Sequence, residues 1–227
     1  MRVGPSLASS AATVLLLAAC GGGGGDSAAP VAASYAVAAS FAHLLAAGGS
    51  WTMSGTANGQ SFTLVNAFAP AAAGTFPLTG VAASELTETL TVTVGNQITV
   101  ASETIYFDRT SGAIFGAQSD GSCSGANSNT PLPTTAALGA SGPIYASSDY
   151  VDCTTSSGVV GTTANTWSLV ADSGVVLLCW NLTSKDPSGT VNGSESSCFE
   201  IAADGTPGGK ATFSASALGA TLQARNF

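Results

Sequence analysis

Alternation of apolar and polar residues is the dominant pattern along this chain, and it is typical of β-strands with one buried face. It is clearest where threonine alternates with Leu90, Val92 and Val94, just before the turn Gly95-Asn96. Asn58-Gly59 likewise separates two apolar stretches, as in a β-hairpin. We identify about nine short strands of this kind, so the pattern predicts a mainly β fold, either an antiparallel sandwich or an up-and-down barrel.

One short segment, residues 34–47, follows a helical period instead. Ser34 can cap the start of this helix, and Gly48-Gly49 is expected to end it. The expected fold is therefore β-rich with one short N-terminal helix. The apolar stripe of that helix consists of Val37, Phe41, Leu44 and Leu45.

Residues 119–161 break both patterns, because they are rich in serine, glycine and proline. Loops of this length are uncommon in compact domains and are usually functional. We therefore expect a long loop that a disulfide between Cys123 and Cys153 holds in place. Tyrosines beside carboxylates can stack on sugars or peptides, or they can pack the loop onto the sheet. The candidate ligand contacts in this loop are Tyr145, Asp149, Tyr150 and Asp152.

The N-terminus has the three-part shape of an export signal: Arg2, then the uncharged run 7–19, then small residues. It ends in Leu17-Ala18-Ala19-Cys20, which resembles the lipobox of bacterial lipoprotein signal peptides. The resemblance implies cleavage before Cys20 and lipidation of its thiol and amino group. Glycine rather than aspartate at position 21 resembles an outer-membrane address of this class, and we expect the periplasmic face, with the cell surface as the alternative. An ordinary signal peptide cut after Ala19 is the alternative.

Three segments follow from this interpretation. Residues 1–19 are the signal peptide, residues 20–33 are the lipidated cysteine with a flexible glycine-rich tether, and residues 34–227 are a single β-rich domain. Two small lobes divided at the long loop remain an alternative to the single domain.

Four cysteines remain besides Cys20, and in an exported protein four thiols indicate two disulfides. Three connectivities are possible, and we favour the sequential one because each bridge then closes a self-contained segment. A zinc site is the rival interpretation, but the chain has no CxxC pair and only His43 could join the ligands. The favoured pairs are Cys123–Cys153 and Cys179–Cys198.

The charge balance excludes several partners. Lys+Arg number 5 and Asp+Glu 13, for a net charge of −8, and only 8% of residues are charged. Nucleic-acid binding needs clustered cations, so we expect none. Calcium ligation by Asp186 to Glu195 would not follow the EF-hand spacing, and Asp120 near Asp149 and Asp152 is a second oxygen cluster. We expect neither a metal nor a cofactor.

Catalytic groups are scarce. His43 is the one histidine, and no Gly-x-Ser-x-Gly turn presents a serine nucleophile. Carboxylate pairs of the kind that glycosidases use remain the catalytic option. The two candidate pairs are Glu85 with Glu88, and Asp149 with Asp152.

We therefore expect a lipid-anchored envelope protein that presents a non-catalytic β domain, for binding a glycan, a peptide or an apolar ligand or for envelope structure. The alternatives are a carboxylate-dependent hydrolase acting on envelope glycans, and a barrel that carries an apolar ligand. A deep cleft with paired, buried carboxylates would count against the non-catalytic interpretation.

Overall fold

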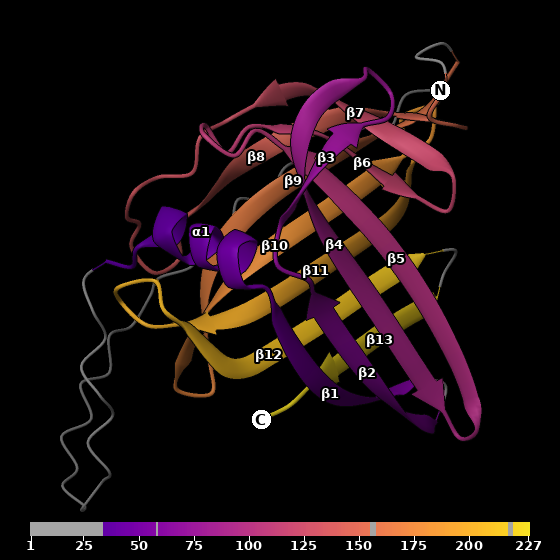
Figure 1. Ribbon diagram of the computed structural model, residues 1–227. Coiled ribbons are helices and arrows are strands. Elements are labelled where there is room, and N and C mark those ends of the chain that lie inside the picture. The colour runs from indigo at the N-terminus through magenta and orange to yellow at the C-terminus, as the bar shows by residue number, and fades with distance from the viewer. Residues whose placement is uncertain (1–33, 58, 155–157, 218–219) are drawn as a thin grey trace, which may run out of the picture. The chain divides into compact units, whose positions relative to one another are not determined.

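The computed structural model describes residues 34–57, 59–154, 158–217 and 220–227. The signal peptide, Cys20 and the tether expected from the sequence lie outside these ranges. Within them the chain has one helix and thirteen strands, and every strand pairing is antiparallel (Figure 1). The elements are α1 (Val37–Ala47), β1 (Gly49–Ala57), β2 (Gln60–Phe68), β3 (Ala72–Phe76), β4 (Val81–Val94), β5 (Gln97–Phe107), β6 (Ile114–Ser119), β7 (Ser122–Asn129), β8 (Ser141–Tyr150), β9 (Val159–Asp172), β10 (Val175–Lys185), β11 (Val191–Ile201), β12 (Pro207–Ala217) and β13 (Ala220–Arg225).

Twelve of these strands form a closed up-and-down barrel. From β4 to β13 each strand pairs with the next, β13 pairs with β1, and β1 pairs with β2. Pairing of β2 with β4 then closes the ring, with Leu64 opposite Val92. β3 is the additional strand, and it pairs only with the first part of β4 while β2 pairs with the later part. The barrel is thus confirmed over the sandwich and the two-lobe alternative.

The expected strand number of nine was too low, and the expected loop at 119–161 was wrong. This segment contains β7, β8 and the start of β9. Its small side chains give little apolar alternation, so the sequence pattern misses strands that are held by backbone pairing with their neighbours. Ser124, for example, pairs with Ala117 on one side and with Asp149 on the other.

Both expected disulfides are present. Cys123–Cys153 joins the start of β7 to the segment that follows β8. Cys179–Cys198 joins directly opposite positions of β10 and β11 on the outer wall of the barrel. In a loop-entropy estimate each bridge stabilises the fold by roughly 3–4 kcal/mol.

Helix α1 is confirmed, but it begins at Val37 and Ser34 does not cap it. The preceding Tyr35 forms a β-bridge with Ala136, which holds that stretch extended. Gly48 ends the helix with a φ of +67°, a conformation that glycine adopts readily. α1 lies across one end of the barrel (Figure 1), where the Phe41 ring is 5.2 Å from that of Trp180.

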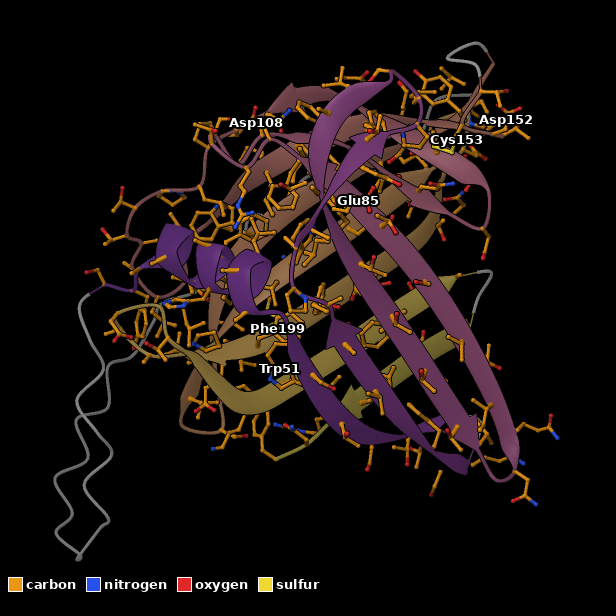
Figure 2. All side chains as sticks on the ribbon, viewed as in Figure 1. Trp51, Glu85, Asp108, Asp152, Cys153 and Phe199 are labelled. Atoms are coloured by element: carbon orange, nitrogen blue, oxygen red, sulfur yellow. A yellow bond between two sulfur atoms is a disulfide. The ribbon has the colours of Figure 1, made fainter. Side chains whose placement is uncertain are left out.

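Below α1 the barrel is filled by an apolar core. Trp51 and Phe199 stack with their ring centroids 4.2 Å apart, and Figure 2 shows them side by side. A space of only about 40 Å³ remains between α1 and this core. No helix among the described residues is long and apolar enough to cross a membrane. The buried core also includes Leu64, Phe68, Leu86, Ile105, Phe107, Trp167 and Leu169.

Candidate functional site

Two glutamates face the inside of the barrel on neighbouring strands. On β4 the inward positions alternate through Leu86, Glu88 and Leu90, so Glu88 occupies an otherwise apolar face. The two-residue turn between β4 and β5 pairs Val94 with Gln97, and this register sets Glu88 directly opposite Glu103. Like charges at directly opposite positions destabilise a sheet. This pairing is therefore costly for the fold.

Asp149 of β8 and Glu195 of β11 bring two further carboxylates to the same region. The charge of Glu195 raises the pKa of both Glu88 and Glu103, and the charge of Asp149 raises the pKa of Glu103. Charges influence one another in this way only over short distances through a poorly solvated interior. Acidic side chains from β4, β5, β8 and β11 thus converge inside the barrel.

A cavity of about 240 Å³, which we call the acidic cavity, lies between these strands. Since one water molecule occupies about 30 Å³ in the liquid, the cavity is large enough for a small organic molecule. Its walls combine acidic, amide and aromatic groups. The lining residues are Phe68, Glu88, Leu90, Ala101, Ser102, Glu103, Ser119, Tyr145, Asn165, Trp180, Leu182, Glu195 and Ser197.

The acidic cavity is open to solvent at the end of the barrel away from α1. Thr99 and Ala101 continue the inward alternation of β5 from Glu103, yet both are exposed. They lie towards the tip of the β4–β5 hairpin, which Figure 1 shows at the opposite end from α1. A molecule can therefore enter from this end, while α1 and the apolar core cover the other.

Burial raises the pKa values of the carboxyl groups in the cavity and so favours their protonated form. Desolvation, followed by the charges of Glu195 and Glu103, raises the pKa of Glu88 to about 8. Desolvation also leads in raising the pKa of Glu103 to about 7. The pKa values of Asp149 and Glu195 are raised by burial as well, although hydrogen bonds from Thr163 and Ser197 oppose part of each shift.

Two polar atoms of the cavity wall, Glu88 Oε1 and Asn165 Nδ2, have neither solvent contact nor a hydrogen-bond partner, and a third such atom, Asn66 Oδ1, belongs to a residue that does not line the cavity. The other end of each amide is held, because Asn165 Oδ1 accepts a hydrogen bond from Trp180 Nε1 at 2.8 Å and Asn66 Nδ2 donates to Ser197 Oγ at 3.4 Å. Asn165 is only 2% exposed. A buried polar group without a partner costs about 1–3 kcal/mol, so the two atoms of the cavity wall are available to a ligand.

No cationic side chain in the described ranges lines the acidic cavity. The ion pair between Arg225 and Asp172, at 2.9 Å, lies on the exterior, and both side chains are partly exposed. Searched over the same residues, no group of histidine, cysteine and acidic side chains is placed to hold a metal ion. Neutralisation of the carboxylates thus comes from protons or from a bound molecule.

The structure separates the four candidate contacts of the expected loop. Tyr145 is buried in the cavity wall, and Asp149 faces the same interior. Tyr150 follows Asp149 in the strand alternation and points to the outer side. Asp152 is exposed beyond the end of β8, next to Cys153 (Figure 2). Two of the four residues therefore belong to the site, and they do so as strand residues.

The two candidate carboxylate pairs are separated as well. Glu88 lies in the cavity, whereas Glu85 faces outwards where β4 pairs with β3, opposite Ala72. His43 is exposed on α1. Asp186 accepts hydrogen bonds within the β10–β11 turn, from Ser188 and Thr190. None of these sets brings its members together as a catalytic or calcium site.

Sequence reasoning missed Glu103, Glu195 and the two buried asparagines. A signal for Glu103 existed, because the Gly95-Asn96 turn determines which residue lies opposite Glu88. No local signal existed for Glu195, which reaches the site through closure of the barrel.

Comparisons with protein-family models, with curated proteins and with solved structures found no match for this chain.

The unliganded domain is expected to lose stability as the pH rises from about 4.5 to about 8. Below this window Glu88 is protonated in both the folded and the unfolded state. Within it the unfolded chain releases a proton that the folded chain retains, so the free energy of unfolding falls. Glu88→Gln should make the dependence shallower, whereas Glu85→Gln, outside the cavity, should leave it unchanged. Urea unfolding across this window measures the slopes, and identical slopes for the wild type and Glu88→Gln would contradict the assignment.

Proposed function

We propose that the chain is a lipid-anchored envelope protein whose barrel binds a small polar molecule in the acidic cavity without catalysing a reaction. The observation that carries the proposal is the set of unpartnered polar atoms around an open cavity, above all Glu88 Oε1 and Asn165 Nδ2. Natural folds rarely leave such atoms without a partner. A ligand that supplies those hydrogen bonds removes the free-energy cost of leaving these atoms without partners.

The scaffold suits binding because the cavity is preformed. Its walls come from strands held on both sides by neighbours, and Cys179–Cys198 fixes β10 against β11, which contribute Trp180 and Glu195. A preorganised site loses little conformational entropy when the ligand binds. The binding interpretation therefore requires no closing motion.

An apolar ligand is supported less well. The apolar space below α1 is only about 40 Å³, and the larger cavity is lined by three glutamates. An apolar chain there would leave those carboxyl groups without hydrogen bonds.

A carboxylate-dependent hydrolase is the second candidate, and one observation favours it. Glu88 and Glu103 are paired, half-buried and face a cavity, which is close to the arrangement that counts against a purely non-catalytic role. Glycoside hydrolysis needs a protonated acid beside an ionised partner. Glu88 has the raised pKa of such an acid, and Glu195, whose charge contributes to that shift, would be the ionised partner. Binding is the stronger proposal because Asn165 Nδ2, an amide donor that this hydrolysis does not use, is also left without a partner in the cavity wall.

The membrane anchor is proposed from the lipobox at Leu17–Cys20 alone. Two or more acyl chains give stable attachment, whereas one chain gives only marginal attachment. Gly21 after the cysteine supports the outer membrane, on the periplasmic face.

Ligand binding can be tested by thermal unfolding of the full-length Cys20→Ser protein with panels of amines, neutral sugars and carboxylic acids. A ligand at a hundred times its Kd stabilises by about 2.7 kcal/mol, which raises the Tm by roughly 5–10 °C in a domain of this size. Ala101→Trp at the cavity mouth should abolish the shift. Val100→Trp, on the neighbouring outward position, should retain it. Failure of every class to stabilise the wild type would refute the proposal.

Hydrolysis can be tested by incubating the same protein with peptidoglycan and envelope polysaccharides and counting new reducing ends. We expect none. If the wild type released them, and Glu88→Gln and Glu103→Gln did not while Glu85→Gln and Asp152→Asn did, the hydrolase would replace the binding module.

The anchor predicts that Cys20→Ser moves the protein from the membrane fraction to the soluble fraction. Mass spectrometry of the wild type should show an acylated N-terminal cysteine at position 20. A Cys20→Ser protein that stays in the membrane fraction would contradict lipid anchoring.

A further inference from the structure

Resting on the proposed function, we infer that the ligand of the acidic cavity is a small organic ammonium ion with a short, partly apolar body. Its cationic group would lie among Glu88, Glu103 and Glu195. Charge, hydrogen-bonding capacity and wall chemistry each favour this class of ligand independently.

The charge argument comes from the carboxyl groups that face one another across the cavity. Glu88 faces Glu103 from β5 and Glu195 from β11, and Glu103 is also influenced by Asp149 from β8. Tyr145 lies in the same wall, and burial and these acids raise its pKa, so it remains neutral. No described lysine or arginine lines the cavity. An anionic ligand would meet repulsion from three sides, whereas a cation stabilises the ionised acids.

The hydrogen-bonding argument comes from the unpartnered atoms. Glu88 Oε1 faces the cavity without a donor, although the Asn66 side chain bonds the same carboxyl group, and an ammonium group supplies three N–H donors and no acceptor. Asn165 Nδ2 is a donor without an acceptor, so an oxygen on the body of the ligand would complete the set. A ligand that offered acceptors alone would satisfy only the last of these atoms.

The remaining wall explains why the ligand is organic. Phe68, Leu90 and Leu182 line the cavity beside the glutamates, and the rings of Tyr145 and Trp180 flank them. Aromatic faces attract cations, and aliphatic walls accept methylene groups. A bare metal ion would leave this apolar surface uncovered, and the described acids are not grouped as metal ligands.

Binding near neutral pH should release a proton. Glu88, with a pKa of about 8, is largely protonated near neutral pH, and an arriving ammonium ion keeps its own protons. One carboxyl group of the cluster then ionises, its proton passes to the buffer, and the carboxylate pairs with the ammonium. The charge of the cavity and its contents is the same before and after binding. Release of a proton therefore distinguishes binding inside the cavity from non-specific attraction of a cation to the acidic protein as a whole.

The test is isothermal titration calorimetry on the full-length Cys20→Ser protein with two matched sets of probes. One set is ethanolamine, ethylene glycol and glycolate, and the other is phenethylamine, 2-phenylethanol and phenylacetate. At least one amine should bind at least tenfold more tightly than its neutral and anionic counterparts. Its apparent enthalpy should change with the ionisation enthalpy of the buffer, which reports the released proton.

Substitution of residues inside and outside the cavity tests where the amine binds. Glu88→Gln and Glu103→Gln should each weaken amine binding at least tenfold, while Glu85→Gln, with the same charge change outside the cavity, should not. Circular dichroism establishes that each variant is folded, and Ala101→Trp blocks the mouth without altering an acid. Equal affinity of Glu88→Gln and the wild type would overturn the inference.

Other outcomes separate this inference from the proposed function. If the neutral probes or sugars bind and the amines do not, the ammonium inference fails and the binding module stands. If calcium chloride gives the cavity-dependent heat and the amines give none, the ligand is a metal ion and the inference fails. If no class of molecule binds, both fail together.

Discussion

Pairing of β2 with β4 is the interaction on which the rest of this structure depends, because it turns an antiparallel sheet into a closed ring. In an open sheet the alternation of side chains distinguishes only two faces. In a ring the same alternation distinguishes an interior from an exterior, and it brings together residues from strands that are far apart in the chain. Glu88 and Glu195 are 107 positions apart, yet the charge of one raises the pKa of the other. The ring also allows β3 to remain outside it, paired with the part of β4 that β2 does not reach.

Closure of the ring also makes the acidic cavity unfavourable for the stability of the fold. Inward glutamates occupy places where leucine or valine would stabilise the core, and burial forces their carboxyl groups towards the neutral form. The apolar core at the α1 end and the two disulfides offset this cost. Strongly shifted acids at an open cavity are more typical of functional sites than of structural ones. On the outer wall, in contrast, β4 presents Thr89, Thr91 and Thr93. Four of the 13 acidic residues of this chain, Glu88, Glu103, Asp149 and Glu195, therefore lie where the fold tolerates charge least.

Local signals predicted much of the fold. The turn at Gly95-Asn96 was confirmed because a two-residue hairpin is decided by its own residues and the flanking alternation. The strands of 119–161 were missed because serine, glycine and alanine lack that alternation, and neighbouring strands hold them in the sheet. For the site, Glu88 carried a readable signal, since it interrupts the apolar face of Leu86 and Leu90. Asp149 was a candidate only as part of an expected loop, and Glu195 carried no signal, because only the closed ring brings it near Glu88.

The ring has the fewest paired residues between its N-terminal strand, β1, and its C-terminal strand, β13. Over the part of the chain that the structure describes, β1 and β13 share two register pairs, Ser54 with Arg225 and Gly55 with Ala224, whereas β1 and β2 share nine. The side-chain contacts of Arg225 and Phe227 strengthen the opposite side of β13, since the Arg225 guanidinium bonds Asp172 of β9 and the Phe227 ring packs beside Leu177 of β10. Separation of β1 from β13 would release two unpaired edges that can recruit strands from other molecules. These two register pairs thus protect the barrel from polymerising edge to edge.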